Sequence, residues 1–167
     1  LLRHFPPEKS GMATQMFNTV HFLRQAGVDA RVVRLLYNAR EWQHEYVSEA
    51  VPASFFMADR LRELRDKYEP DIIHFDSPWP AGRAIARASG CPTAISVGGR
   101  TFDEFRDYHK YTNTGWLMGK LKGTFLSMLT RRILNSVDMV FAEGTDIKEH
   151  LRGHGVNSPI HAINNGV

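Results

Sequence analysis

The 167-residue chain has one cysteine, Cys91, and no long apolar run. A lone cysteine cannot form an internal disulfide, which fits a reducing compartment. A membrane-spanning helix needs about 18 or more consecutive apolar residues, and none occurs. The first residues also lack the charged start and apolar stretch of a secretory signal peptide. These absences predict a cytoplasmic protein, and the net charge of +3 is too small to argue for a nucleic-acid partner.

Several catalytic signatures are missing as well. The chain has no Gly-x-Gly-x-x-Gly fingerprint, which disfavours a nicotinamide-dependent enzyme, and no phosphate-binding loop ending in Gly-Lys-Ser/Thr. It has no Gly-x-Ser-x-Gly elbow for a serine nucleophile. Among its eight histidines we expect no His-x-x-x-His pair on one helix face with a third ligand nearby, so we predict no metal site. His74 falls inside an expected strand and should pack there.

What is present is an alternation of short apolar strands with helices. The residues 1–5 resemble the end of a first strand, and further strands are predicted over 28–36, 71–75, 92–97, 138–142 and 159–163. Helices are predicted over 12–26, 54–68, 81–89, 116–136 and 145–152, with short helical pieces after residue 101. Residues 37–53 show no clear pattern. This order predicts one α/β domain over residues 1–167, with a Rossmann-like parallel sheet and helices on both faces.

Ligands of parallel sheets bind beyond the carboxyl ends of the strands, so the loops there are the candidate site. Ser10 and Gly11 precede a helix, whose free N–H groups favour a phosphate; alternatively, Ser10 is an ordinary N-cap and Gly11 a turn residue. Other loop residues could bind substrate. Paired glycines would expose bare backbone, Arg100 would offer a cation, Trp79 an aromatic face, and Glu143 to Thr145 groups that hydrogen-bond hydroxyls. These candidates are Met12, Asp76, Ser77, Trp79, Gly98, Gly99, Arg100, Glu143, Gly144 and Thr145.

Each of these candidates also has a simpler interpretation. Gly98 to Arg100 could form a flexible turn with a solvated arginine, and Trp79 could be a lid packed on the core. Thr145 could simply cap the following helix. No catalytic residue is assigned.

Residues 116–132 form a basic amphipathic stretch. Apolar side chains between Trp116 and Leu129 fall on one side of the expected helix, and Lys120, Lys122, Arg131 and Arg132 add positive charge. Such a helix can lie on an anionic membrane surface, which here would be the inner face of the membrane. The alternative is a helix packed on the sheet with a solvated cationic face.

The last strand runs into Asn164-Asn165-Gly166, residue types that tolerate positive φ and mark a turn. A turn directly after a sheet strand is typical of a hinge. We therefore expect this domain to be followed by a second domain that the 167 residues do not include.

The order of these segments resembles the N-terminal domain of family 4 (group 1) glycosyltransferases, which have the GT-B fold. The resemblance covers nearly the whole chain. It rests on Phe5-Pro6-Pro7 with Ser10-Gly11, the helix end at Gly27, Pro70-Asp71-Ile72-Ile73-His74, Gly90-Cys91-Pro92, Val137-Asp138-Met139-Val140-Phe141-Ala142 and Asn164-Asn165-Gly166-Val167.

The resemblance implies two Rossmann-like domains facing each other, with most nucleotide-sugar contacts in the C-terminal domain that is absent here. The N-terminal domain would shape the acceptor site, and Gly11 would lie near the donor phosphates. Transfer in this family usually retains the anomeric configuration and usually needs no metal or other cofactor. One departure stands out: the family often has His-Gly where this chain has Gly98-Gly99, which removes a side chain expected near the donor sugar.

The leading hypothesis is thus the acceptor-binding half of a retaining glycosyltransferase, moving a sugar from a nucleotide-sugar to a glycan or lipid-linked acceptor. The fragment alone is expected to be inactive. Two alternatives remain: half of a nucleotide-sugar epimerase, or a non-catalytic module that binds a sugar or nucleotide.

Overall fold

A computed structural model describes residues 11–36, 46–52, 57–76, 78, 90–111 and 115–163. The helices in this part of the chain are α1 (Gly11–Gln25), α2 (Met57–Tyr68), α4 (Thr101–Arg106), α5 (Tyr108–Tyr111), α6 (Trp116–Leu134) and α7 (Thr145–Gly153). The strands are β1 (Val32–Leu36), β2 (Val47–Pro52), β3 (Ile73–Phe75), β4 (Thr93–Val97), β5 (Met139–Ala142) and β6 (Ile160–Ala162).

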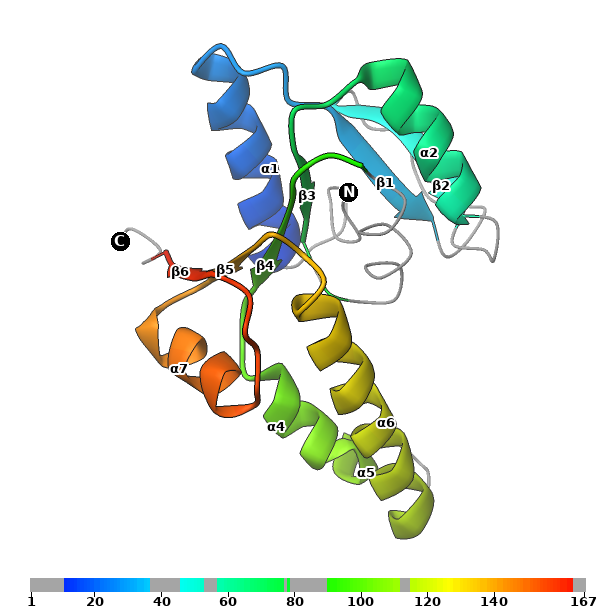
Figure 1. Ribbon diagram of the computed structural model, residues 1–167, viewed down its shortest axis with the longest axis vertical. Coiled ribbons are helices and arrows are strands. Elements are labelled where there is room, and N and C mark those ends of the chain that lie inside the picture. The colour runs from blue at the N-terminus through cyan, green and yellow to red at the C-terminus, as the bar shows by residue number, and fades with distance from the viewer. Residues whose placement is uncertain are drawn as a thin grey trace.

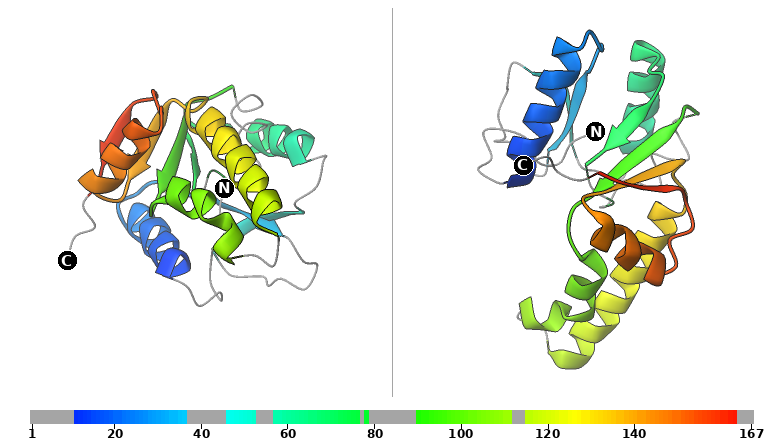
Figure 2. Two further views of the ribbon diagram at one scale, coloured as in Figure 1. Left: turned by 90° about the horizontal axis from the view of Figure 1, so that it is seen from below. Right: turned by 90° about the vertical axis from the view of Figure 1, so that its left-hand side faces the viewer.

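The described strands form two sheets in which every pair is parallel. β1 pairs with β2, and the larger sheet has the order β3-β4-β5-β6. Helices lie on both sides of the strands, with α1 opposite α2, α6 and α7 (Figures 1 and 2). The predicted α/β architecture is therefore confirmed, although the helix expected over 81–89 lies outside the described residues.

The main core lies where the larger sheet meets α6 and α7. β4 is buried at all five positions, as expected for a central strand paired on both sides. Ile95 and Val97 pack in one cluster with Ile133 and Leu134 of α6 and with Leu151 of α7. A second, smaller cluster joins α1 to β1 through Met16, Val20 and Val32.

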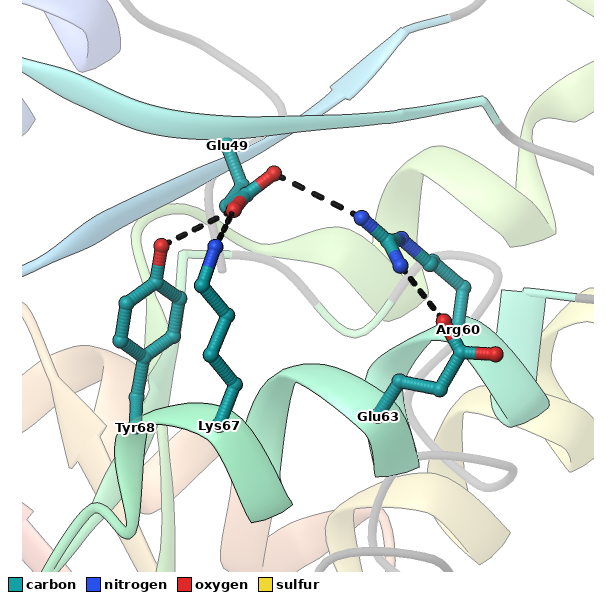
Figure 3. A network of polar contacts seen from close by, with 5 residues as sticks. All are labelled: Glu49, Arg60, Glu63, Lys67 and Tyr68. Carbon is teal, nitrogen blue, oxygen red and sulfur yellow. Dashed lines mark hydrogen bonds and ion pairs between the residues drawn. The ribbon is translucent and has the colours of Figure 1, made fainter.

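β2 is the strand that the sequence did not predict. It pairs along β1 and is tied to α2 by one carboxylate, that of Glu49 (Figure 3). Glu49 Oε1 accepts hydrogen bonds from Lys67 Nζ at 2.5 Å and from Tyr68 Oη at 2.9 Å, and Arg60 Nη2 lies 3.7 Å from Oε2. These contacts lower the pKa of Glu49, chiefly through the Lys67 hydrogen bond.

Three helices form an arm that extends away from the sheet. α4 leaves the end of β4, and α5 and α6 continue the arm, with the N-terminal end of α6 far from the strands (Figures 1 and 2). The close approach of α4 and α6 requires a glycine, because a Cβ at Gly123 would overlap the carbonyl oxygen of Phe105. The inner face of α6 is therefore used for packing.

The two faces of α6 allow a matched test of this packing. Leu134 is fully buried, whereas Leu121 on the same helix is 59% exposed. We expect Leu134→Ala to lower the free energy of unfolding by about 2–5 kcal/mol, because the substitution removes buried methyl groups and leaves a cavity. Leu121→Ala should change it by less than about 0.5 kcal/mol. Urea unfolding followed by circular dichroism measures both, and equal losses would contradict the assigned orientation of α6.

His74 provides a second test, of the sheet itself. Its Nε2 lies 2.8 Å from Ser96 Oγ on the neighbouring strand, and its ring meets Phe141 edge-on at 5.9 Å. The expectation that His74 packs within its strand is thus confirmed. Burial lowers the pKa of His74 to about 4, from an ordinary 6.5.

A histidine whose pKa is lowered on folding contributes stability above its unfolded pKa and loses it as the pH falls. We expect the free energy of unfolding to decrease between about pH 6.5 and pH 4, by up to about 3 kcal/mol from this residue. His74→Gln should flatten this decline, while His161→Gln, at an exposed position of β6, should leave it unchanged. Urea unfolding curves measured across this pH range test the prediction. The same pH dependence of the free energy of unfolding for the wild type and His74→Gln would contradict the lowered pKa of His74.

Candidate functional site

The candidate site lies along the edge where the parallel strands end. Asp76 follows β3, Gly98 follows β4 and Glu143 follows β5, so the parallel topology brings three of the predicted loops to one edge. The N-terminal end of α1, at Gly11, lies toward the same end of the sheet in Figure 1 and in the right-hand view of Figure 2. The expected convergence of strand-end loops is therefore seen for the described residues.

Gly98 and Glu143 lie close together at this edge. Val97 and Ala142 are register partners in β4 and β5, so the residues that follow them are neighbours. A Cβ at position 98 would lie 2.7 Å from Glu143 Oε1 and still closer to Oε2. Only a glycine at position 98 leaves room for the carboxylate in this position. The family resemblance leads us to expect a histidine side chain at position 98. The carboxylate of Glu143 occupies the space next to Gly98 that such a side chain would need.

The carboxylate of Glu143 is also incompletely hydrogen-bonded within the described part of the chain. Its Oε1 is buried and has no hydrogen-bond partner among the described residues. A buried polar atom without a partner costs about 1–3 kcal/mol, so such an atom at a ligand-binding edge is a candidate contact. A carboxylate oxygen accepts hydrogen bonds, and the donors that suit it are hydroxyl or amide groups.

The loops on either side contain glycines in the left-handed region of φ. Gly99 has φ +106 and Gly144 has φ +116, conformations that other residues rarely adopt. Gly144 is the N-cap residue of α7, and no side chain caps that helix. Thr145 is the first residue of α7 and not its N-cap, so the simpler interpretation of Thr145 as the helix cap is wrong.

The guanidinium of Arg100 forms an ion pair with Asp103. Its Nε lies 3.1 Å from Asp103 Oδ2 within α4, in an ion pair whose guanidinium is largely exposed. Exposed pairs of this kind contribute little, so Arg100 can exchange Asp103 for an anionic ligand at small cost. Asp76 is buried and already engaged in an interaction within the protein.

Several predicted site residues cannot be placed. Ser10, Ser77 and Trp79 lie outside the described residues. Gly11 and Met12 form the start of α1, but the side chain of Met12 is not described.

One grouping was missed by the sequence reasoning. His150 and His154 are separated by one helical turn, and α4 places Asp103 beside them, so that one ligand atom from each lies within 4.8 Å of the others. The expectation that no His-x-x-x-His pair has a third ligand nearby was therefore wrong. The signal was present in the spacing of the two histidines, but Asp103 is distant in sequence and joins them only through tertiary packing.

The outer face of α6 exposes a group of large apolar side chains. They are between 53% and 65% exposed, and they are Trp116, Leu117, Met118, Leu121 and Phe125. Among the described helices, none is both long and apolar enough to cross a bilayer.

The comparison with known families decides the classification. The profile of Glycosyltransferase Family 4 matches residues 9–167, nearly the whole chain. The chain belongs to this family. Among curated proteins, no significant match to this family 4 chain is found.

A solved structure supports the same fold. The family 4 chain resembles a crystal structure of UGT73P12 from Glycyrrhiza uralensis complexed with glycyrrhetinic acid 3-O-monoglucuronide, with a TM-score of 0.58 and 14% sequence identity. The likeness covers 98% of this chain but only 48% of that protein. The chain therefore spans about half the length of a GT-B glycosyltransferase, and its fold corresponds to one half of that architecture.

Proposed function

We propose that this chain is the acceptor-side half of a retaining glycosyltransferase that moves a sugar from a nucleotide-sugar to a glycan or lipid-linked acceptor in polysaccharide biosynthesis. Membership of family 4 supports the transferase class. The observation that carries the assignment to this edge of the sheet is the buried Oε1 of Glu143 beside Gly98, which has no hydrogen-bond partner within the described part of the chain. A sugar hydroxyl is a suitable donor for that oxygen.

The proposal gives the other strand-end residues supporting roles. The start of α1, with Ser10 and Gly11, would receive the donor phosphates, because a helix N-terminus presents free N–H groups to an anion. Gly99 and Gly144 would let the substrate approach the backbone closely. The second domain would supply most donor contacts, and the reaction would take place in the cytoplasm without a metal or other cofactor.

Two substitutions test the role of Glu143 in the full-length enzyme. Glu143→Gln keeps the shape but replaces a charged acceptor, which is worth about 1.5–3 kcal/mol in a hydrogen bond, so kcat/KM should fall about 10- to 100-fold. Gly98→Ala should cause a similar loss, because the new methyl group displaces the carboxylate. Folding should be preserved, since Gly98 has an ordinary φ and the displaced atoms end a flexible side chain.

The measurement is glycoside formation from a panel of labelled nucleotide-sugars, with thermal melting as a check on folding. Glu149→Gln, an exposed position of α7, is the matched control and should retain wild-type activity. Full activity of Glu143→Gln with every donor that the wild type accepts would refute the role of Glu143. Release of an altered free sugar in place of a glycoside would favour an epimerase, and binding without turnover would favour a non-catalytic module.

We also propose that the outer face of α6 contacts the inner surface of the membrane, where a lipid-linked acceptor would be held. Leu117, Leu121 and Phe125 follow one another at four-residue intervals and therefore share one face of the helix. Lys120 and Lys122 flank this face at the end of the arm, and Arg131 and Arg132 follow toward the sheet. Apolar groups flanked by cations suit an anionic lipid surface.

Flotation of the full-length protein with vesicles containing an anionic phospholipid tests this contact. Phe125→Ser should reduce the bound fraction, whereas Phe22→Ser, at an equally exposed position of α1, should leave it unchanged. Replacing Lys120, Lys122, Arg131 and Arg132 by Glu should weaken binding about fivefold or more for each residue near the surface. Equal flotation of both Phe variants, or no flotation of the wild type, would exclude the contact; self-association lost only in Phe125→Ser would identify a second copy of the chain as the occupant.

A further inference from the structure

We propose that Asp103, His150 and His154 form a binding site for one Zn²⁺-like divalent ion that clamps α4 against α7 at the base of the arm. The site is separate from the glycosyl-transfer chemistry proposed above and does not depend on it. Two imidazoles and a carboxylate are a common protein ligand set for zinc.

The distances within the cluster suit a shared ion. His150 Nδ1 lies 3.9 Å from Asp103 Oδ2, which is too far for a hydrogen bond. In a tetrahedral zinc site, ligand atoms that each lie about 2.1 Å from the ion are about 3.4 Å apart, so this pair needs to close by roughly 0.5 Å. One ligand atom from each of the three residues lies within 4.8 Å of the others, so the widest pair needs to close by at most roughly 1.4 Å.

His154 is oriented as a metal ligand would be. Its Nδ1 lies 2.8 Å from the carbonyl oxygen of His150, and because a carbonyl only accepts, Nδ1 carries the proton. This leaves the lone pair of the neutral ring on Nε2. Metal-binding histidines usually donate their other N–H to a backbone carbonyl or carboxylate in this way. The ring also stacks on Phe102 at 4.7 Å with an interplanar angle of 2°, which fixes its orientation.

One ring nitrogen of His150 is buried without a hydrogen bond to any described residue. The His150 side chain is only 3% exposed, and this nitrogen is Nε2. An ion bound at Nδ1 would leave the ring proton on Nε2, so the ligand role of His150 rests on the position of Nδ1 beside Asp103. Burial lowers the pKa of His150, assisted by the positive charge that His154 can carry and by Arg100 and Arg106, and opposed by Asp103.

Two arginines compete with the ion for Asp103. Arg100 Nε lies 3.1 Å from Oδ2, and Arg106 Nη1 lies 3.2 Å from Oδ1. Both arginine side chains are about two-thirds exposed, so their pairs with Asp103 are weak and can yield to a divalent ion. The imidazole ligands favour Zn²⁺, Co²⁺ or Ni²⁺ over Mg²⁺ or Ca²⁺, which prefer oxygen ligands.

The cluster lies next to two of the loops at the strand edge, so a bound ion would restrain them. α4 follows the Gly98–Arg100 loop directly, and α7 follows Glu143 and Gly144. An ion joining Asp103 to the end of α7 would fix the helix that begins the arm relative to the loops of the strand edge. Release of Asp103 from Arg100 would also free that guanidinium at the edge.

Titration of the metal-free full-length protein with ZnCl₂ by calorimetry tests the site, and the visible spectrum of the Co²⁺-loaded protein reports the ligand geometry. We expect one equivalent of Zn²⁺ to bind. His154→Ala should weaken binding at least about tenfold, since it removes a ligand. Arg106→Ala should tighten binding, by up to about fivefold, because it removes a competitor for Asp103.

His161→Ala is the control, because His161 is exposed and lies outside the cluster. His154 is exposed too, so its loss should not prevent folding, which melting without metal checks. Zn²⁺ should raise Tm in the wild type and His161→Ala but not in His154→Ala. Equal Zn²⁺ affinity and equal Co²⁺ spectra for the wild type and His154→Ala would overturn the proposal, as would the absence of any bound equivalent in the wild type.

Discussion

Parallel pairing on both sides of β4 is the constraint on which the strand edge depends. All five residues of β4 are buried, and a shift of one residue would exchange its two faces and remove Ile95 and Val97 from their packing against Ile133. The resulting register pairs Val97 with Ala142, and it is this pairing that sets Gly98 beside Glu143. Hydrophobic burial within the sheet thus determines a polar contact just outside it.

The sequence predicted elements whose patterns are local and left out those that depend on partners. The strands around Ile95 and Val140 were found because apolar residues cluster there between turn signals. β2 was missed because Glu49 and Pro52 are poor strand formers; its strand conformation comes from pairing with β1 and from the burial of Val51. The Asp103–His150–His154 cluster was missed for the same reason, because α4 and α7 meet only in the folded protein. Glu143 and Gly98 were both named from their loops, but their contact follows from the register.

The contact between Gly98 and Glu143 also bears on the departure from the family pattern. From the sequence alone, a glycine at position 98 indicates that a functional side chain has been lost. In the folded chain the neighbouring strand places a carboxylate over that glycine. A carboxylate accepts hydrogen bonds and repels anions, whereas an imidazole can donate. The change therefore alters which ligand groups this edge can hold, while keeping a polar side chain there.

The arm links this edge to a distant surface. α6 has 19 residues, so at about 1.5 Å per residue it extends roughly 28 Å, and its exposed apolar residues are concentrated in the half away from the sheet. α4 connects the arm to the Gly98–Arg100 loop, and Gly123 lets α6 pack tightly against α4. A surface that holds the end of α6 would therefore also set the orientation of the strand edge, because α6 packs closely against α4 at Gly123. The cluster of Asp103, His150 and His154 joins α4, the first helix of the arm, to α7, which packs on the sheet, so an ion held there would act on that orientation.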